Sequence, residues 1–198
     1  MVTKRFMFHD TKIAALRARV KQSGTYIEEP TCYEAVTSLL WGAFIHALGN
    51  ADDFRRRMNP PLKPICTGNN ANTTMSLWPA KTKVDYNCLA GRIREAVRKV
   101  DQNHTEVLGA TTLRAEEMSQ SLAGVMSFFC SSWLYPFYES DFGWGKPVWI
   151  AVVPLFNNSI ILLNTSDGEG VEAWVALCKE DMSMFEENHD ILAFASQI

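Results

Sequence analysis

The sequence contains no apolar run of the about 20 residues that a helix needs to cross a bilayer, so no membrane contact is expected. Its basic beginning, residues 1–8, is followed by no apolar stretch, which argues against a secretory signal. The five cysteines are widely spaced and none belongs to a Cys-x-x-Cys pair, so neither a zinc site nor a disulfide framework is predicted. No basic cluster is interleaved with aromatics, which argues against nucleic acid as a partner. Together these absences predict a cytoplasmic protein that holds no metal.

Charge of both signs is present but unevenly distributed. The 198 residues carry 19 Lys and Arg against 22 Asp and Glu, and residues 1–100 hold 16 of the basic and 8 of the acidic ones. Either the two parts of the chain pack together and neutralise each other, or the first part meets an anionic partner. We favour the first interpretation. Since 47% of the residues are hydrophobic, with 6 Trp and 11 Phe, residues 1–198 are expected to bury a sizeable core as a single domain.

Hydrophobic spacing and capping residues predict two helices early in the chain. The first covers residues 10–22, with Asp10 as its N-cap. Thr31 and Glu34 have the spacing of a capping box, which predicts a second helix that ends near Gly49. Three apolar residues are expected to form the buried face of the first helix: Ile13, Leu16 and Val20. Further helices are expected over residues 84–100, 114–122 and 179–188.

Strands dominate the later part of the chain. Residues 171–177 alternate between apolar and other side chains, which is typical of a strand with one buried face. Helices interleaved with strands predict an α/β fold with a mixed β-sheet flanked by helices. The other expected strands are residues 3–8, at the edge or opening of the sheet, 68–78, 125–133, 148–153 and 159–164.

The most informative segment reads Asp-Phe-Gly-Trp-Gly-Lys-Pro, at residues 141–147. Gly143 and Gly145 allow backbone angles that other residues resist, and the final proline fixes the exit of the segment. Trp144 offers a large side chain as an anchor. Asp141 is able to satisfy turn amides or to pair with an Arg. These properties predict a rigid structural corner.

This segment matches the DFGWG signature of the BAHD acyltransferases, which are plant enzymes that use acyl-CoA. Residues 2–6, the helix that begins at Thr31, residues 55–62 and residues 167–174 resemble the same family in the same order. The chain is therefore similar to the C-terminal half of a BAHD acyltransferase, nearest the alkaloid-acylating branch. The resemblance implies the C-terminal domain of a chloramphenicol-acetyltransferase-like two-domain fold, with the N-terminal catalytic half absent from this chain.

The resemblance also assigns roles to individual residues. In the family the DFGWG segment has a structural role, and the resemblance gives the same role to Phe142 and its neighbours. The Asp of the segment pairs with an Arg in the family. The matching residues are Asp141 and Arg55, with Arg56 or Arg57 as the alternative partner because the neighbouring sequence diverges. A segment near the reacting carbonyl helps to hold the oxyanion in the family, and it matches Ser131 and Trp133 here. The gap between that segment and DFGWG is one residue shorter than in the family, and a core role for Trp133 stays open.

The general base of the family, the His of a His-x-x-x-Asp motif, has no counterpart here. None of the four histidines is followed four residues later by Asp, and the near miss is His46, where Asn50 holds that place. The expected catalytic set is therefore empty, and His46 is interpreted as a histidine on a helix face. The apolar strand that the family has before its Arg is also expected to be missing or drastically shortened between Gly49 and Arg55.

The resemblance implies transfer of an acyl group from acyl-CoA to a hydroxyl or amine of a plant specialised metabolite. The resemblance implies acyl-CoA as the co-substrate, and no bound cofactor is expected. Both substrates become partners only when an N-terminal half complements this chain, which is expected to be inactive alone. The alternative is a non-catalytic remnant or binding protein that retains the α/β fold.

Overall fold

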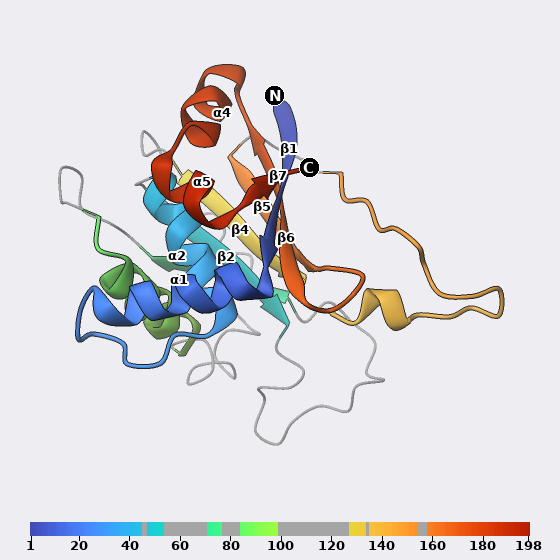
Figure 1. Cartoon of the computed structure of the whole chain (residues 1–198), viewed down its shortest axis with the longest axis horizontal. Coiled ribbons are helices and arrows are strands. Elements are labelled where there is room, and N and C mark those ends of the chain that lie inside the picture. The colour runs from blue at the N-terminus through green and yellow to red at the C-terminus, as the bar shows by residue number, and fades with distance from the viewer. Residues whose placement is uncertain (45–46, 54–70, 77–83, 99–126, 134, 154–157) are drawn as a thin grey trace.

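Seven strands form one mixed sheet in the order β3-β2-β4-β5-β6-β1-β7 (Figure 1). This computed structural model describes residues 1–44, 47–53, 71–76, 84–98, 127–133, 135–153 and 158–198. β4 runs parallel to both β2 and β5, whereas the other strand pairs are antiparallel. The predicted mixed sheet with flanking helices is confirmed. The strands are β1 Val2–His9, β2 Ala47–Asp53, β3 Ala71–Ser76, β4 Ser127–Trp133, β5 Ser159–Asn164, β6 Gly170–Leu177 and β7 Ser196–Gln197.

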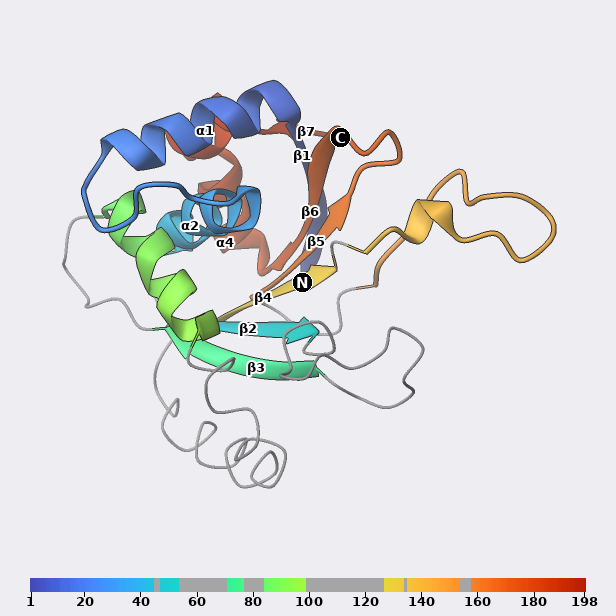
Figure 2. The ribbon, with the colours of Figure 1, turned by 90° about the horizontal axis from the view of Figure 1, so that it is seen from below.

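The helices cover one face of the sheet (Figure 2). Phe6 and Phe8 of β1 and Leu162 of β5 meet the buried sides of the helices in the main core. The largest side chain in that core, Trp41 of α2, is fully buried. No helix in the described part of the chain combines the length and apolarity needed to cross a membrane. The helices are α1 Asp10–Gln22, α2 Cys32–Phe44, a helix over residues 86–98, α4 Lys179–Glu186 and α5 His189–Phe194.

The second face of the sheet, called the outer face below, carries a smaller apolar cluster. Ile161, Leu163 and Trp174 pack there against Val152. The prediction that β6 buries one face only is therefore wrong. The alternating side chains of β6 do point to opposite faces of the sheet. Nearly every residue of the strand is buried, however, because a segment that includes Val152 covers part of the outer face.

The capping box at the start of α2 is confirmed. The Thr31 amide donates to Glu34 Oε2 at 2.7 Å, and the Glu34 amide donates to Thr31 Oγ1 at 3.2 Å. Arg94, from the helix over residues 86–98, adds two bonds of 2.7 Å, one to each oxygen of the Glu34 carboxylate. Burial raises the pKa of Glu34, but the bonds from Arg94 and Thr31 outweigh it, so the pKa lies below its ordinary value. Glu34, which caps α2, thus also connects α2 to the helix over residues 86–98.

Helix boundaries differ from the predictions near both ends of the chain. α1 begins at Asp10 itself, so the N-cap is His9, which makes no capping bond with its side chain. The predicted buried face of α1, Ile13, Leu16 and Val20, is confirmed. The closing helix predicted over residues 179–188 is α4, which ends at Glu186. A further helix, which was not predicted, follows as α5, and Asn188 caps it by accepting bonds from the amides of Asp190 and Ile191.

The strand expected to be missing before Arg55 is present. α2 ends at Phe44 rather than near Gly49, and β2 begins at Ala47. β2 is rich in Asn and Asp, so its sequence gives little sign of a strand. It forms because main-chain pairing with β3 on one side and β4 on the other satisfies its backbone. The helix predicted over residues 114–122 lies outside the described residues.

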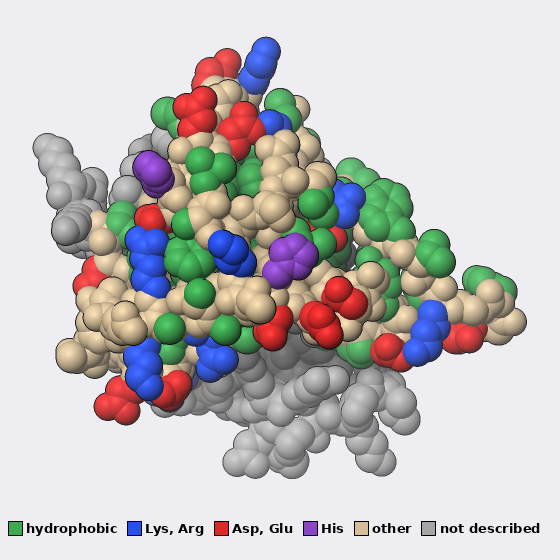
Figure 3. All heavy atoms as spheres, in the orientation of Figure 1, with side chains coloured by type: hydrophobic (Ala, Val, Ile, Leu, Met, Phe, Trp, Pro, Cys, Tyr) green, Lys and Arg blue, Asp and Glu red, His purple; other side chains and the backbone are tan. Residues whose placement is uncertain are grey.

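Ion pairs join the basic first part of the chain to the acidic second part. Lys4 pairs with Glu186, and Arg19 Nη2 lies 2.7 Å from Asp190 Oδ1. Figure 3 shows Lys and Arg side chains next to Asp and Glu side chains on the same face. These contacts support the interpretation that the two parts of the chain neutralise each other, rather than that the first part forms a separate anion-binding patch.

Candidate functional site

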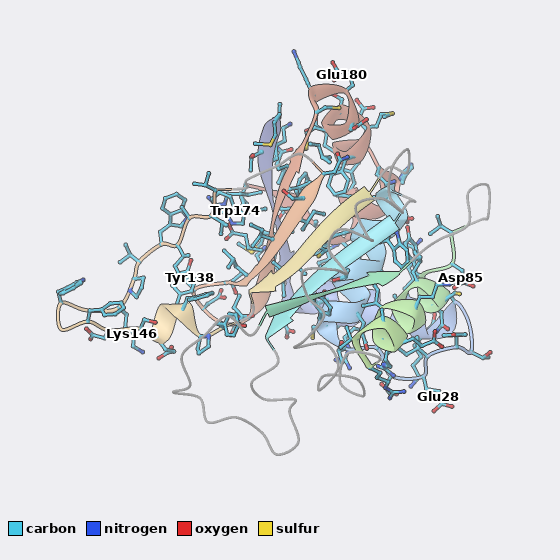
Figure 4. All side chains as sticks on the ribbon, turned by 180° about the vertical axis from the view of Figure 1, so that it is seen from behind. Glu28, Asp85, Tyr138, Lys146, Trp174 and Glu180 are labelled. Atoms are coloured by element: carbon cyan, nitrogen blue, oxygen red, sulfur yellow. The ribbon has the colours of Figure 1, made fainter. Side chains whose placement is uncertain are left out.

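Residues 135–153 form an arm that leaves the sheet after β4 and stands away from the body of the molecule (Figures 1 and 2). A short 3-10 helix, η1 Phe137–Glu139, opens the outgoing limb. The ion pair between Lys146 and Glu139 and a 3.3 Å bond from the Ile150 amide to Tyr138 Oη join the two limbs. Figure 4 shows Tyr138 and Lys146 on the arm, away from Trp174 on the sheet. The arm presents the DFGWG segment at its tip.

The turn at the tip is organised by Asp141. Its Oδ1 accepts a bond of 2.8 Å from the Gly143 amide and one of 3.1 Å from the Gly145 amide. These donors, Gly143 first, hold the pKa of the Asp141 carboxyl below its ordinary value. Both glycines have φ near +100°, at 102° and 104°, and a Cβ at either would meet nothing within 4 Å. Glycine is needed there for its backbone angle and not for space.

Trp144 does not anchor this turn, so that prediction is wrong. Its side chain is 84% exposed, and its ring stacks on Phe142, which is itself 76% exposed. The turn projects from the sheet, and Trp144 belongs to neither core cluster of the described residues.

The predicted partner of Asp141, Arg55, lies outside the described residues, and the pairing stays a prediction. We expect Asp141→Asn and Arg55→Met to lower the free energy of unfolding by less together than the sum of their separate effects, because each removes the same contact. Asp141 Oδ1 already serves the turn amides, which leaves Oδ2 for the guanidinium. Urea unfolding of the four proteins of this cycle measures the coupling. Arg56→Met in place of Arg55→Met is the matched control, and equal coupling with both arginines would contradict the assignment.

Ser131 and Trp133 lie near the carboxyl end of β4. The backbone of Ser131 is in register with Ala51 of β2 and Ile161 of β5, and that of Trp133 with Leu163. The structure thus places them at the point where the central strand leads into the arm. Their oxyanion role stays a prediction. The neighbouring thiol is no nucleophile, because burial raises the pKa of Cys130 to about 12 and keeps it protonated.

A cluster that the sequence did not reveal joins the arm to the outer face. Arg5 Nε donates to Glu172 Oε1 at 2.6 Å. The Arg5 guanidinium carbon lies 5.0 Å from the ring centre of Trp174 and 5.6 Å from that of Trp149, which belongs to the arm. Alternation in β6 places Glu172 and Trp174 on one face, but nothing in the sequence predicts that the arm returns over them.

The structure describes two of the four histidines, and it places them on different elements. His9 precedes α1, His189 opens α5, and His46 and His104 lie outside the described residues. Because His46 is not described, its interpretation as a histidine on a helix face is not tested. Among the described residues, no three His, Cys, Asp or Glu lie close enough to hold a metal ion.

Comparison with known proteins finds relatives by sequence and neighbours by fold. The family model described as the Transferase family matches residues 1–192. A limonoid 21-O-acetyltransferase from Citrus sinensis is 36% identical over 98% of this chain and 49% of its own length. A stemmadenine O-acetyltransferase from Catharanthus roseus is 33% identical over 95% of this chain and 47% of its own length.

Solved structures share the fold. The crystal structure of vinorine synthase has a TM-score of 0.77 and 27% identity, covering 98% of this chain and 48% of that protein. TRI101 of F. sporotrichioides, solved with coenzyme A and T-2, has a TM-score of 0.68 and 18% identity. The match covers 98% of this chain and 50% of TRI101, and at this identity it shows a shared fold alone. The chain thus spans about half the length of the proteins that it matches.

Proposed function

The chain belongs to the BAHD transferase family, and from this we propose that it is the C-terminal half of an acyl-CoA-dependent acyltransferase, formed by residues 1–198 as one domain. The observation that carries the proposal is the family match over residues 1–192, together with its extent of about half of each relative. The reaction needs a second polypeptide segment, because the 198 residues contain no His-x-x-x-Asp motif.

In the proposed reaction the acceptor hydroxyl or amine attacks the thioester carbonyl of acyl-CoA. A base on the complementary half takes the acceptor proton, and CoA leaves as its thiol once the tetrahedral intermediate collapses. Ser131 and Trp133, at the carboxyl end of β4, contribute to holding the oxyanion of that intermediate. Asp141 keeps the structural role that its bonds to Gly143 and Gly145 support.

The substrates are proposed from the relatives. TRI101 of F. sporotrichioides was solved with coenzyme A, which supports acyl-CoA as the donor. Relatives named as limonoid and stemmadenine O-acetyltransferases support a hydroxyl of a plant specialised metabolite as the acceptor. A cytoplasmic location, without nucleic acid or membrane as a partner, completes the proposal.

One observation favours a second candidate function, a non-catalytic protein that keeps the fold. No histidine in this sequence is followed by Asp at the fourth position, so any activity depends on another segment. In that case the chain would bind a ligand or a partner without turnover.

A chimera separates the two candidates. The matching half of the Citrus sinensis limonoid 21-O-acetyltransferase is replaced by this chain, and free CoA is measured with acetyl-CoA and that enzyme's limonoid acceptor. We expect turnover that is lost when the motif His of the Citrus half is changed to Ala. A folded chimera that binds CoA but gives no turnover with the limonoid or a panel of alcohols and amines would favour the non-catalytic function.

A further inference from the structure

The turn that joins β5 to β6 contains the single Asp-Gly pair of the sequence, Asp167-Gly168, and the sequence contains no Asn-Gly pair. An Asp followed by Gly converts to isoaspartate more readily than other Asp residues, because glycine has no Cβ to hinder the attack of its own nitrogen. The turn projects beyond the ends of the two strands, and residues 166–169 are all exposed (Figure 1). The sequence alone therefore makes Asp167 the position most open to this modification.

The modification is a reaction of the chain with itself. The Gly168 nitrogen attacks Cγ of the Asp167 carboxyl, and the hydroxyl of the protonated carboxyl leaves with the amide proton as water. Hydrolysis of the resulting five-membered succinimide adds one water back. When the ring opens at the Asp167 main-chain carbonyl, the chain is linked through Cγ and carries one more methylene carbon in its backbone. The reaction therefore needs a free Gly168 amide, a carboxyl turned toward it, and a proton on that carboxyl.

The folded turn withholds the amide. The Gly168 amide donates to the Thr165 carbonyl at 3.0 Å, and the Thr165 amide donates to the Gly170 carbonyl at 3.2 Å. Gly168 has a φ of 75°, which glycine adopts without strain. The attack on Cγ thus requires that the main-chain bond between Gly168 and Thr165 be broken first.

The turn also withholds the carboxyl. The Thr165 hydroxyl donates to Asp167 Oδ1, and the Glu169 amide donates to the same oxygen at 3.0 Å. The carboxylate is thereby bound to the residue after Gly168. These donors, Thr165 first, hold the pKa of the Asp167 carboxyl below its ordinary value, and an ionised carboxylate has no hydroxyl to lose. We call the bonds from Thr165 to Asp167 and to Gly168 the Thr165 clasp.

We propose that Asp167 is a site of isoaspartate formation that the Thr165 clasp keeps closed in the folded chain. The added methylene would lengthen the turn and separate Thr165 from Gly170 at the base of the hairpin. Gly170 leaves no room for such a shift, because a Cβ there would lie 2.6 Å from the Phe8 carbonyl oxygen, and its backbone is in register with His9. The modification would therefore disturb β6 against both β5 and β1. This inference holds for either candidate function.

Incubation of the folded chain at neutral pH tests the clasp, with peptide mapping by mass spectrometry to measure isoaspartate at residue 167. We expect formation to be about tenfold slower, or more, in the folded chain than in the same chain unfolded in urea, because folding adds more than one hydrogen bond around the reacting groups. Thr165→Val removes the hydroxyl and keeps the branched shape. It should accelerate formation in the folded chain by about fivefold, the factor that corresponds to one lost hydrogen bond.

Ser166→Ala is the matched control, because it removes the adjacent exposed hydroxyl and should leave the rate unchanged. Asp167→Glu should give no signal at this position, since the longer side chain cannot close a five-membered ring. Equal rates in the folded and the urea-unfolded chain would overturn the inference, and that comparison needs no variant. Equal rates for Thr165→Val and Ser166→Ala would overturn the role of Thr165. If Thr165→Val does not fold, Thr165→Ser replaces it, and a folded Thr165→Ser chain that reacts as fast as the unfolded chain would contradict the clasp.

Discussion

The chain alone should release free CoA from acetyl-CoA, in the presence of alcohols or amines, no faster than buffer does. A positioned general base contributes about 10²- to 10⁴-fold to such a reaction, and the sequence offers no His-x-x-x-Asp motif to supply one. The tip of the arm is also open to water, with Phe142 and Trp144 exposed, so that surface provides no closed cleft for orienting two substrates. Continuous detection of the free thiol measures the rate.

His46 is the residue on which this first prediction depends most, since Asn50 takes the place of the motif Asp. His46→Ala is therefore the informative variant, and His189→Ala, in α5, is its control. Turnover well above buffer that disappears with His46→Ala and persists with His189→Ala would establish His46 as a base and contradict the prediction.

Replacing Asn87 should have the largest effect on stability. Asn87 is fully buried at the start of the helix over residues 86–98. Its Oδ1 accepts bonds from the amides of Tyr26 and Ile27, at 2.7 and 3.0 Å. Its Nδ2 donates to the carbonyls of Val20 and Ile27, at 2.9 and 2.8 Å. One side chain thus satisfies four main-chain groups at the end of α1 and in the loop that follows it.

Asn87→Ala is expected to lower the free energy of unfolding by about 3 kcal/mol or more. A buried polar group left without a partner costs about 1–3 kcal/mol, and this change leaves several. Urea unfolding followed by circular dichroism measures the difference, provided that the slope with denaturant is unchanged. Cys88→Ala, the half-buried neighbour, is the control and should cost about 1 kcal/mol or less. Equal midpoints for the two variants would show that Asn87 does not hold this junction.

Local signals in the sequence were sufficient where a few neighbouring residues decide the conformation. Thr31 and Glu34 specify the start of α2, and the strand predicted over residues 159–164 is β5 with the same bounds. Asp141 and its two glycines specify the turn at the tip of the arm, because the carboxylate reaches amides only two and four residues away. The DFGWG string was also enough to indicate the family, which the match over residues 1–192 then showed.

Only the tertiary structure decided the features that depend on a partner distant in the chain. β2 forms from residues of low strand propensity because β3 and β4 satisfy its main chain on both sides. The strand predicted over residues 148–153 is wrong despite its high strand propensity, because no strand among the described residues pairs with it. Arg5 meets Trp149 only because the arm returns over β1 and β6. A strand requires main-chain partners, so its sequence fixes its tendency to form, while the path of the rest of the chain fixes whether it does.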